Sequence, residues 1–179
     1  MDFRFFESLT ATQAKDYLER FLQVESEAVT KLVLDLLNDG IEADYSIPSI
    51  EPVFGWAIES LRWSTAATDS DLPTWITDTP SYASGNFEFD EPSRAIVLRC
   101  AYYLGRSFVE TIPGLHWSTG PPDRAECNMP IVAGFRHDMG MAVMLITDNL
   151  FRRIIADSAP KSEVGRTVDY WADMAGGLP

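Results

Sequence analysis

The chain has 179 residues, of which 46% are hydrophobic and 23% charged, with a formal net charge of −13. This length and composition are typical of one globular domain and exclude a disordered or fibrous protein. The longest aliphatic run, Met141 to Ile146, is far shorter than the roughly 20 residues that a membrane span needs. The start of the chain lacks the apolar stretch of a secretion signal, so we expect a cytoplasmic protein that does not enter the membrane.

The acidic excess lies entirely in the first half of the chain. Residues 1–91 contain 18 acidic and 5 basic side chains, whereas residues 92–179 contain nine of each. A strongly anionic half repels phosphate backbones, so this distribution disfavours a nucleic-acid partner and favours a protein with a basic surface. The alternative interpretation is that the acids serve solubility alone.

Three helices are predicted in residues 1–63. Apolar residues recur at helical spacing from Thr12 to about Leu22 and again from Ser26 to Leu37, with Thr12 as an N-cap. A third helix is expected to start after Ser49 as N-cap and to end near residue 63.

Residues 64–90 are predicted to be a long acidic and aromatic loop, with one short strand at residues 86–89. The segment is rich in Ser, Thr, Asp and Pro and contains no Lys or Arg, and loops of this length are often functional. Acidic side chains and aromatic anchors together suit a basic protein surface. The predicted partner-binding residues are Asp69, Asp71, Trp75, Asp78, Tyr82, Phe87 and Glu88.

The predicted core lies in residues 91–179. Asp90 is expected to cap a helix that is apolar on most of its circumference and ends at residues 112–114, and Gly105 indicates that a backbone or an aromatic ring passes close to its middle. Strands at 115–119 and 129–135 are expected to pair antiparallel, with Pro130 at the start or on an edge. Helices are then expected at 139–156, with Asp138 as N-cap, and at 162–174.

These elements predict an α+β fold: a mainly helical single domain, residues 1–179, with a small antiparallel β-sheet. An acidic helical half (1–63) and the long loop (64–90) precede the core (91–179), which contains a helix, strand, strand, helix unit at 91–156. The chain contains no glycine-rich phosphate-binding motif, no nucleophile elbow and no compact zinc signature. No catalytic residue, cofactor or metal is therefore predicted.

The residues at 95–155 resemble a loose group of small bacterial proteins of undefined function, some of which are regarded as immunity proteins against polymorphic toxins. Tyr103, Leu104 and Gly105 in a helix, Trp117 in the following strand, and Pro130 with Val132 in the next strand carry the resemblance, together with the helix that ends near Phe151. The resemblance implies a helix, strand, strand, helix core and a bacterial source. It transfers no active-site residue.

Three functional hypotheses follow. The first is a non-enzymatic binding protein, specifically an immunity protein that neutralises a basic toxin through its acidic N-terminal half. The second is a small enzyme or metal-binding protein that uses Cys127, His116, His137 and Asp138. The third is a structural or oligomeric accessory protein, which a self-complementary surface would favour.

Overall fold

The computed structural model describes residues 3–65 and 87–176 as a mainly helical α+β fold, as the sequence predicts. The elements in chain order are α1 (Arg4–Glu7), α2 (Ala11–Asn38), the 3-10 helix η1 (Ile47–Ser49), α3 (Ile50–Ser60), β1 (Trp63–Thr65), β2 (Phe87–Phe89), α6 (Glu91–Thr111), β3 (His116–Thr119), β4 (Pro130–Ala133), the 3-10 helix η2 (Arg136–Asp138), α7 (Val143–Ile155) and α8 (Glu163–Met174).

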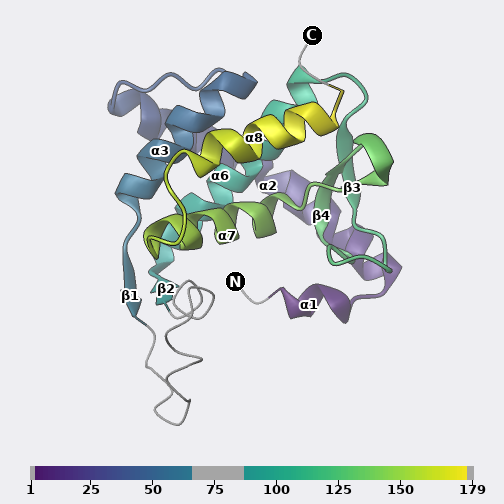
Figure 1. Ribbon diagram of the computed structural model, residues 1–179. Helices are drawn as coiled ribbons and strands as arrows, with labels where there is room; N and C mark the ends of the chain where they lie inside the picture. The colour runs from purple at the N-terminus through teal and green to yellow at the C-terminus, as the bar shows by residue number, and fades with distance from the viewer. Residues whose placement is uncertain (1–2, 66–86, 177–179) are drawn as a thin grey trace.

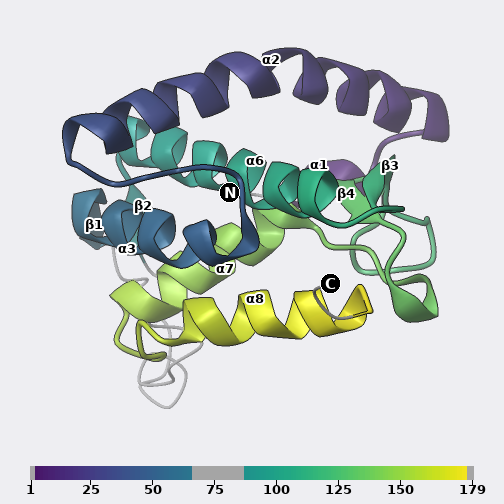
Figure 2. The same ribbon diagram turned by 90° about the horizontal axis from the view of Figure 1, so that it is seen from above.

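Helix α6 occupies the centre of the molecule. It contacts α2, α3 and α7, and Figure 2 shows α2 lying along one side of it, with α7 and α8 on the other. A continuous run, residues 100–105, is buried within it, and Phe108 is fully buried. A helix that is apolar around most of its circumference is stable only when other elements cover all of its sides, and α6 therefore organises the core.

The first half of the chain contains one long helix where the sequence patterns predict two. Helix α2 continues through residues 23–26, because no glycine or proline interrupts it there. Its N-cap is Thr10 and not the predicted Thr12. The Thr10 hydroxyl accepts from the backbone N–H of Gln13, and the Gln13 side chain accepts from the Thr10 N–H, which completes a capping box.

Helix α3 starts directly after Ser49, the predicted N-cap position, but it is shorter than predicted and lacks the expected capping bond. Ser49 makes no capping bond to the helix, because its hydroxyl donates to the carbonyl of Ser46 at 2.7 Å and also contacts the Tyr103 hydroxyl at 2.6 Å. The helix ends at Ser60, and the following residues enter strand β1. That strand was not predicted, since three residues are too few for a periodic pattern.

Two separate two-stranded antiparallel sheets flank the helices. In the first, β1 pairs with β2 so that Trp63 lies opposite Phe89. In the second, β3 pairs with β4, which confirms the predicted pairing, and Pro130 is the first residue of its strand. The position suits proline because it has no N–H to donate to a ladder.

Gly105 faces an aromatic ring, one of the two close neighbours that its place in the middle of an apolar helix predicts. A Cβ atom on this residue would overlap the six-membered ring of Trp117 in β3. The missing side chain therefore lets β3 approach α6 directly.

Helix α7 begins four residues later than predicted. Residues 139–142 are instead extended, and Met141 bridges to Val132 of β4 through two backbone hydrogen bonds. Asp138 cannot act as the expected N-cap, because it lies in η2 with a positive φ of 54° and is separated from the helix by this extended segment. The last helix, α8, closely matches its predicted range.

Candidate functional site

Four acidic side chains, which we call the acidic face, lie at the end of α2, on the linker after it (residues 39–46) and at the start of α3. They are Asp39, Glu42, Asp44 and Glu51, all exposed. No Lys or Arg occurs between residues 31 and 62, and none of the four carboxylates forms an ion pair within the described residues. This group therefore presents uncompensated negative charge to solvent.

Two hydrogen bonds fix carboxylates of the acidic face in position. Asp39 accepts from the indole N–H of Trp56 at 2.6 Å. Asp44 accepts from the backbone N–H of Ser46 at 2.9 Å, and the hydrogen bonds from Ser46 hold the pKa of Asp44 below its ordinary value. The charged form of Asp44 is thus the one that the linker stabilises.

Other acids of the first half are compensated by cations from the second half. Asp35 pairs with Arg99 at 3.2 Å, and Glu59 pairs with Lys161 at 3.1 Å. The predicted negative exterior is therefore partly neutralised, while the four acids of the acidic face keep their charge without an ion pair within the described residues.

The linker that carries the acidic face is held against α6 by contacts to Tyr45. Tyr45 has a left-handed φ of 62°, its N–H donates to the Tyr103 hydroxyl at 3.1 Å, and its carbonyl accepts from the Thr111 hydroxyl at 3.2 Å. Arg106 lies 4.5 Å from the centre of the Tyr45 ring. A non-glycine residue keeps a positive φ only when its surroundings hold it there, so the linker has a defined shape.

Arg106 also joins the linker to α2. It pairs with Glu110 at 2.7 Å, and its charge lowers the pKa of the neighbouring Glu25 on α2, although burial outweighs this effect and raises that pKa overall. The arrangement places two carboxylates around one guanidinium. We interpret Arg106 as a structural link among the linker, α2 and α6, because it bonds to Glu110 and lies over the Tyr45 ring.

The hairpin β1–β2 is anchored to α7 by Arg152. Its guanidinium donates to the Phe87 carbonyl at 2.7 Å and pairs with the buried Asp148 at 2.8 Å. It also lies 5.2 Å from the ring centres of both Phe87 and Phe89, which is within the range of a cation–π contact. These contacts hold the β1–β2 hairpin against α7.

The structure describes two of the seven predicted partner-binding residues. Glu88 is exposed, as a contact residue must be, but Phe87 is buried, with 5% of its surface exposed. Phe87 therefore contributes to packing and is corrected from a binding residue to a core residue. The other five, Asp69, Asp71, Trp75, Asp78 and Tyr82, lie outside the described residues.

The residues of the enzyme or metal-binding hypothesis do not form a metal site. His116 and His137 are exposed, and Cys127 is half-buried in the loop between β3 and β4. Within residues 3–65 and 87–176, no three His, Cys, Asp or Glu side chains are arranged to hold a metal ion. Asp138 takes part in a structural contact, since its backbone carbonyl accepts from Arg124 at 2.7 Å.

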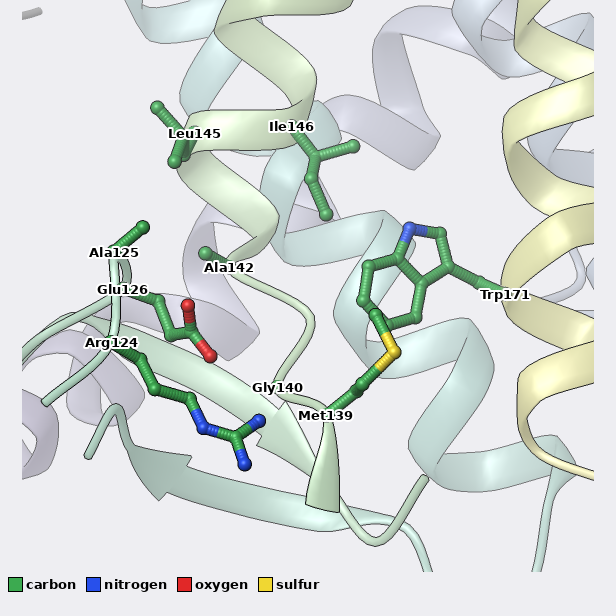
Figure 3. Close-up of a pocket in the computed structure, with 9 residues that line it drawn as sticks. All are labelled: Arg124, Ala125, Glu126, Met139, Gly140, Ala142, Leu145, Ile146 and Trp171. Carbon is green, nitrogen blue, oxygen red and sulfur yellow. The ribbon is translucent and has the colours of Figure 1, made fainter. Parts of the chain in front are cut away.

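A pocket of about 440 Å³ opens between the β3–β4 loop, the N-terminal end of α7 and α8. Figure 3 shows Trp171 on one side and Arg124 with Glu126 on the other, while the Met139 side chain extends toward the indole. The remaining lining residues are small or aliphatic: Ala125, Gly140, Ala142, Leu145 and Ile146.

The chemistry of this pocket is that of an apolar recess with one charged edge. Its described lining contains no serine, cysteine or histidine, so it holds none of the usual nucleophiles or neutral-pH bases. Trp171 is held by the Phe135 ring, 4.9 Å away centre to centre. The sequence carries little signal for this pocket, because its residues come from three segments that no short motif links.

Comparisons with known proteins return no relationship: no family model, no curated protein and no solved structure matches the chain. The resemblance to toxin-immunity proteins therefore stays a prediction. No helix in the described part of the chain has the length and apolar character to span a membrane.

Proposed function

We propose that this protein acts by binding a basic protein partner, and that the acidic face is the centre of the binding surface. The observation that carries the proposal is the set of four exposed carboxylates, Asp39, Glu42, Asp44 and Glu51, without a compensating cation. Complementary charge accelerates association and selects against partners of like charge.

The shape of the supporting backbone also favours binding. A surface that is ordered before it meets its partner loses less conformational entropy on association. The linker satisfies this condition because Tyr103, Thr111 and Arg106 of α6 hold Tyr45 through three contacts.

The surface is extended by the hairpin at the other end of α3. Figure 1 shows the linker and the hairpin on the same side of the molecule, joined by α3. Trp63 is 50% exposed on β1 and Glu88 is exposed on β2. Glu88 lies opposite Ser64 and Trp63 lies opposite Phe89, so the hairpin presents an aromatic group on one face and an acidic group on the other. Large aromatic residues are common anchors in protein interfaces.

The class of partner that we propose is a basic toxin, which the protein neutralises as an immunity protein. The support for this narrower proposal is the resemblance at residues 95–155 and the acidic face, since many toxins that act on nucleic acids need a basic cleft. If the partner is such a toxin, coexpression of this protein should restore the growth of cells that produce it.

The proposal is tested by capturing partners from a lysate of the source cells at low salt. The test variant combines Glu42→Gln, Glu51→Gln and Glu88→Gln, and the matched control combines Asp123→Asn, Asp169→Asn and Asp173→Asn, which are exposed acids of the second half. A basic protein that the wild type and the control retain should bind the test variant about tenfold more weakly. Equal retention by both variants, or no basic protein among those retained, would contradict the proposal.

A further inference from the structure

The outer side of α2 carries a stripe of exposed residues with the spacing of a coiled coil. These residues, the α2 outer stripe, follow one another at alternating intervals of four and three: Arg20, Val24, Glu27, Lys31, Leu34 and Asn38. Side chains at this spacing lie along one line on a helix. Figure 2 shows α2 as the outermost layer of the molecule, with its outer side uncovered and bowed away from the core.

The stripe combines apolar side chains with unpaired charges. Val24 is 50% and Leu34 is 55% exposed, and Leu37, directly beside the stripe, is 67% exposed. Within the described part of the chain, Arg20, Glu27 and Lys31 form no ion pair. The stripe thus has two basic groups and one acidic group, in contrast to the acidic face, and it does not fit the basic partner proposed above.

We infer that the α2 outer stripe binds a second copy of this chain, with the two α2 helices antiparallel. In a twofold contact, residue i of one protomer faces residue j of its partner, and residue j faces residue i. When Glu27 faces Lys31 of the second copy, Val24 faces Leu34 and Arg20 faces Asn38. Every layer of the stripe is then matched, and each layer occurs twice.

The same residues exclude a parallel arrangement. Two parallel helices in register would place Arg20, Glu27 and Lys31 each opposite its own copy, and three of the six layers would bring like charges together. The antiparallel contact also agrees with the outward bow of α2, because two convex helices meet at their middles. The contacting segment from Val24 to Leu34 is about 15 Å long at 1.5 Å per residue.

Charge reversal at the central layer tests the inference. Sedimentation of the full-length chain at concentrations up to about 1 mM, the range of weak association, should show a dimer. Glu27→Lys and Lys31→Glu should each weaken it at least about tenfold, because each places like charges opposite each other twice. The double variant Glu27→Lys/Lys31→Glu should restore the dimer, since it exchanges the charges within the same layer.

Two controls separate the stripe from general effects of charge and hydrophobicity. Glu42→Lys makes the same charge change on the linker and should leave dimerisation intact. Leu34→Ser should weaken the dimer, whereas Tyr170→Ser, which removes another half-exposed apolar side chain from α8, should not. All substituted residues are exposed, and circular dichroism is expected to show unchanged helix content.

Any of three results would overturn the inference. The chain could remain monomeric throughout the concentration range, the single reversals could leave the dimer unaffected, or the charge exchange could fail to restore association. Failure here would leave the proposed function standing, since capture of the basic partner depends on the acidic face and not on α2. Conversely, the dimer should persist in the Gln variant of the acidic face.

Discussion

Helices α2 and α6 are the two longest in the described chain, and they differ in how much of their surface is buried. Helix α6 buries ten of its 21 residues, whereas α2 buries only five of its 28 and leaves its outer side in solvent. The polar groups of α6 serve the fold: the Tyr102 hydroxyl donates to the Phe21 carbonyl at 2.8 Å, and Tyr103 bonds the linker.

The difference shows where binding capacity can reside. Side chains of α6 are already occupied by neighbours, so altering them changes stability. The outer side chains of α2 are exposed to solvent, so altering them should mainly change what α2 meets outside the molecule. Four experiments sharpen or break this contrast, in order of decreasing expected effect.

Truncating one buried and one exposed apolar residue gives the largest contrast. Phe108→Ala in α6 removes a ring that is fully buried and should lower the free energy of unfolding by about 3–5 kcal/mol. Val24→Ala in α2 should change it by less than about 0.5 kcal/mol, because half of that side chain is already in water. Urea denaturation at a concentration where the protein is monomeric measures both, and similar losses would contradict the contrast.

Adding one methyl group tests how closely α6 is packed. Gly105→Ala improves helix propensity by about 1 kcal/mol, but the new Cβ overlaps the Trp117 ring, so we expect a net loss of about 2 kcal/mol. The control is Gly55→Ala in α3, where a Cβ has open space and should stabilise the protein by about 1 kcal/mol. Stabilisation by both substitutions would show that β3 does not approach α6 as described.

Removing a tyrosine hydroxyl from each helix compares their polar contacts. Tyr103→Phe leaves the Tyr45 N–H and the buried Ser49 hydroxyl without this partner, and we expect a loss of about 1–2 kcal/mol. Tyr17→Phe in α2 should have little effect, because the Tyr17 hydroxyl makes no hydrogen bond within the described residues. Thermal unfolding of the two variants beside the wild type would show the difference, and an equal change in both would contradict it.

The N-caps of the two helices should respond differently to acid. Asp90 caps α6 by accepting from the Ser93 N–H at 2.9 Å, and the hydrogen bonds from Ser93 hold its pKa below the ordinary 3.8. A lowered native pKa means that the stabilisation is complete above pH 3.8 and is lost as the pH falls through the native value. Thr10, the cap of α2, does not titrate.

The measurement is the midpoint of thermal unfolding as the pH is lowered from neutral to below 3.8. Asp90→Ser keeps a capping hydroxyl and removes the titrating group, so its stability should fall less over that interval than that of the wild type. Parallel pH profiles for the two proteins would show that the Asp90 cap does not contribute to acid sensitivity.

Local patterns predict much of the fold because they reflect interactions between residues close in the chain. The cap at Asp90 and the breadth of the apolar surface of α6 can be identified from a few consecutive residues. Gly105 correctly indicated a close neighbour, a backbone or an aromatic ring, and the structure shows the ring of Trp117. The break predicted near residue 24 was wrong, because a change in the apolar stripe does not end a helix when every residue there has adequate helix propensity.

The candidate surfaces could be predicted only in part. A segment without basic residues is visible in the sequence, but the pairing of Asp35 with Arg99 and of Glu59 with Lys161 joins residues that are distant in the chain. Phe87 illustrates the same limit, since nothing local distinguishes an aromatic anchor from a core ring. The ring is packed against Arg152, which comes from α7, far away in the chain.

By itself, the sequence determined the fold class, the central helix and the antiparallel pairing of β3 with β4, because hydrophobic periodicity, turn residues and caps act over a few positions. Only the tertiary structure decided which acids remain uncompensated, where the pocket forms and which side of α2 is left uncovered. Those properties depend on the packing of segments far apart in the chain, and side-chain burial and ion pairing are set by that packing.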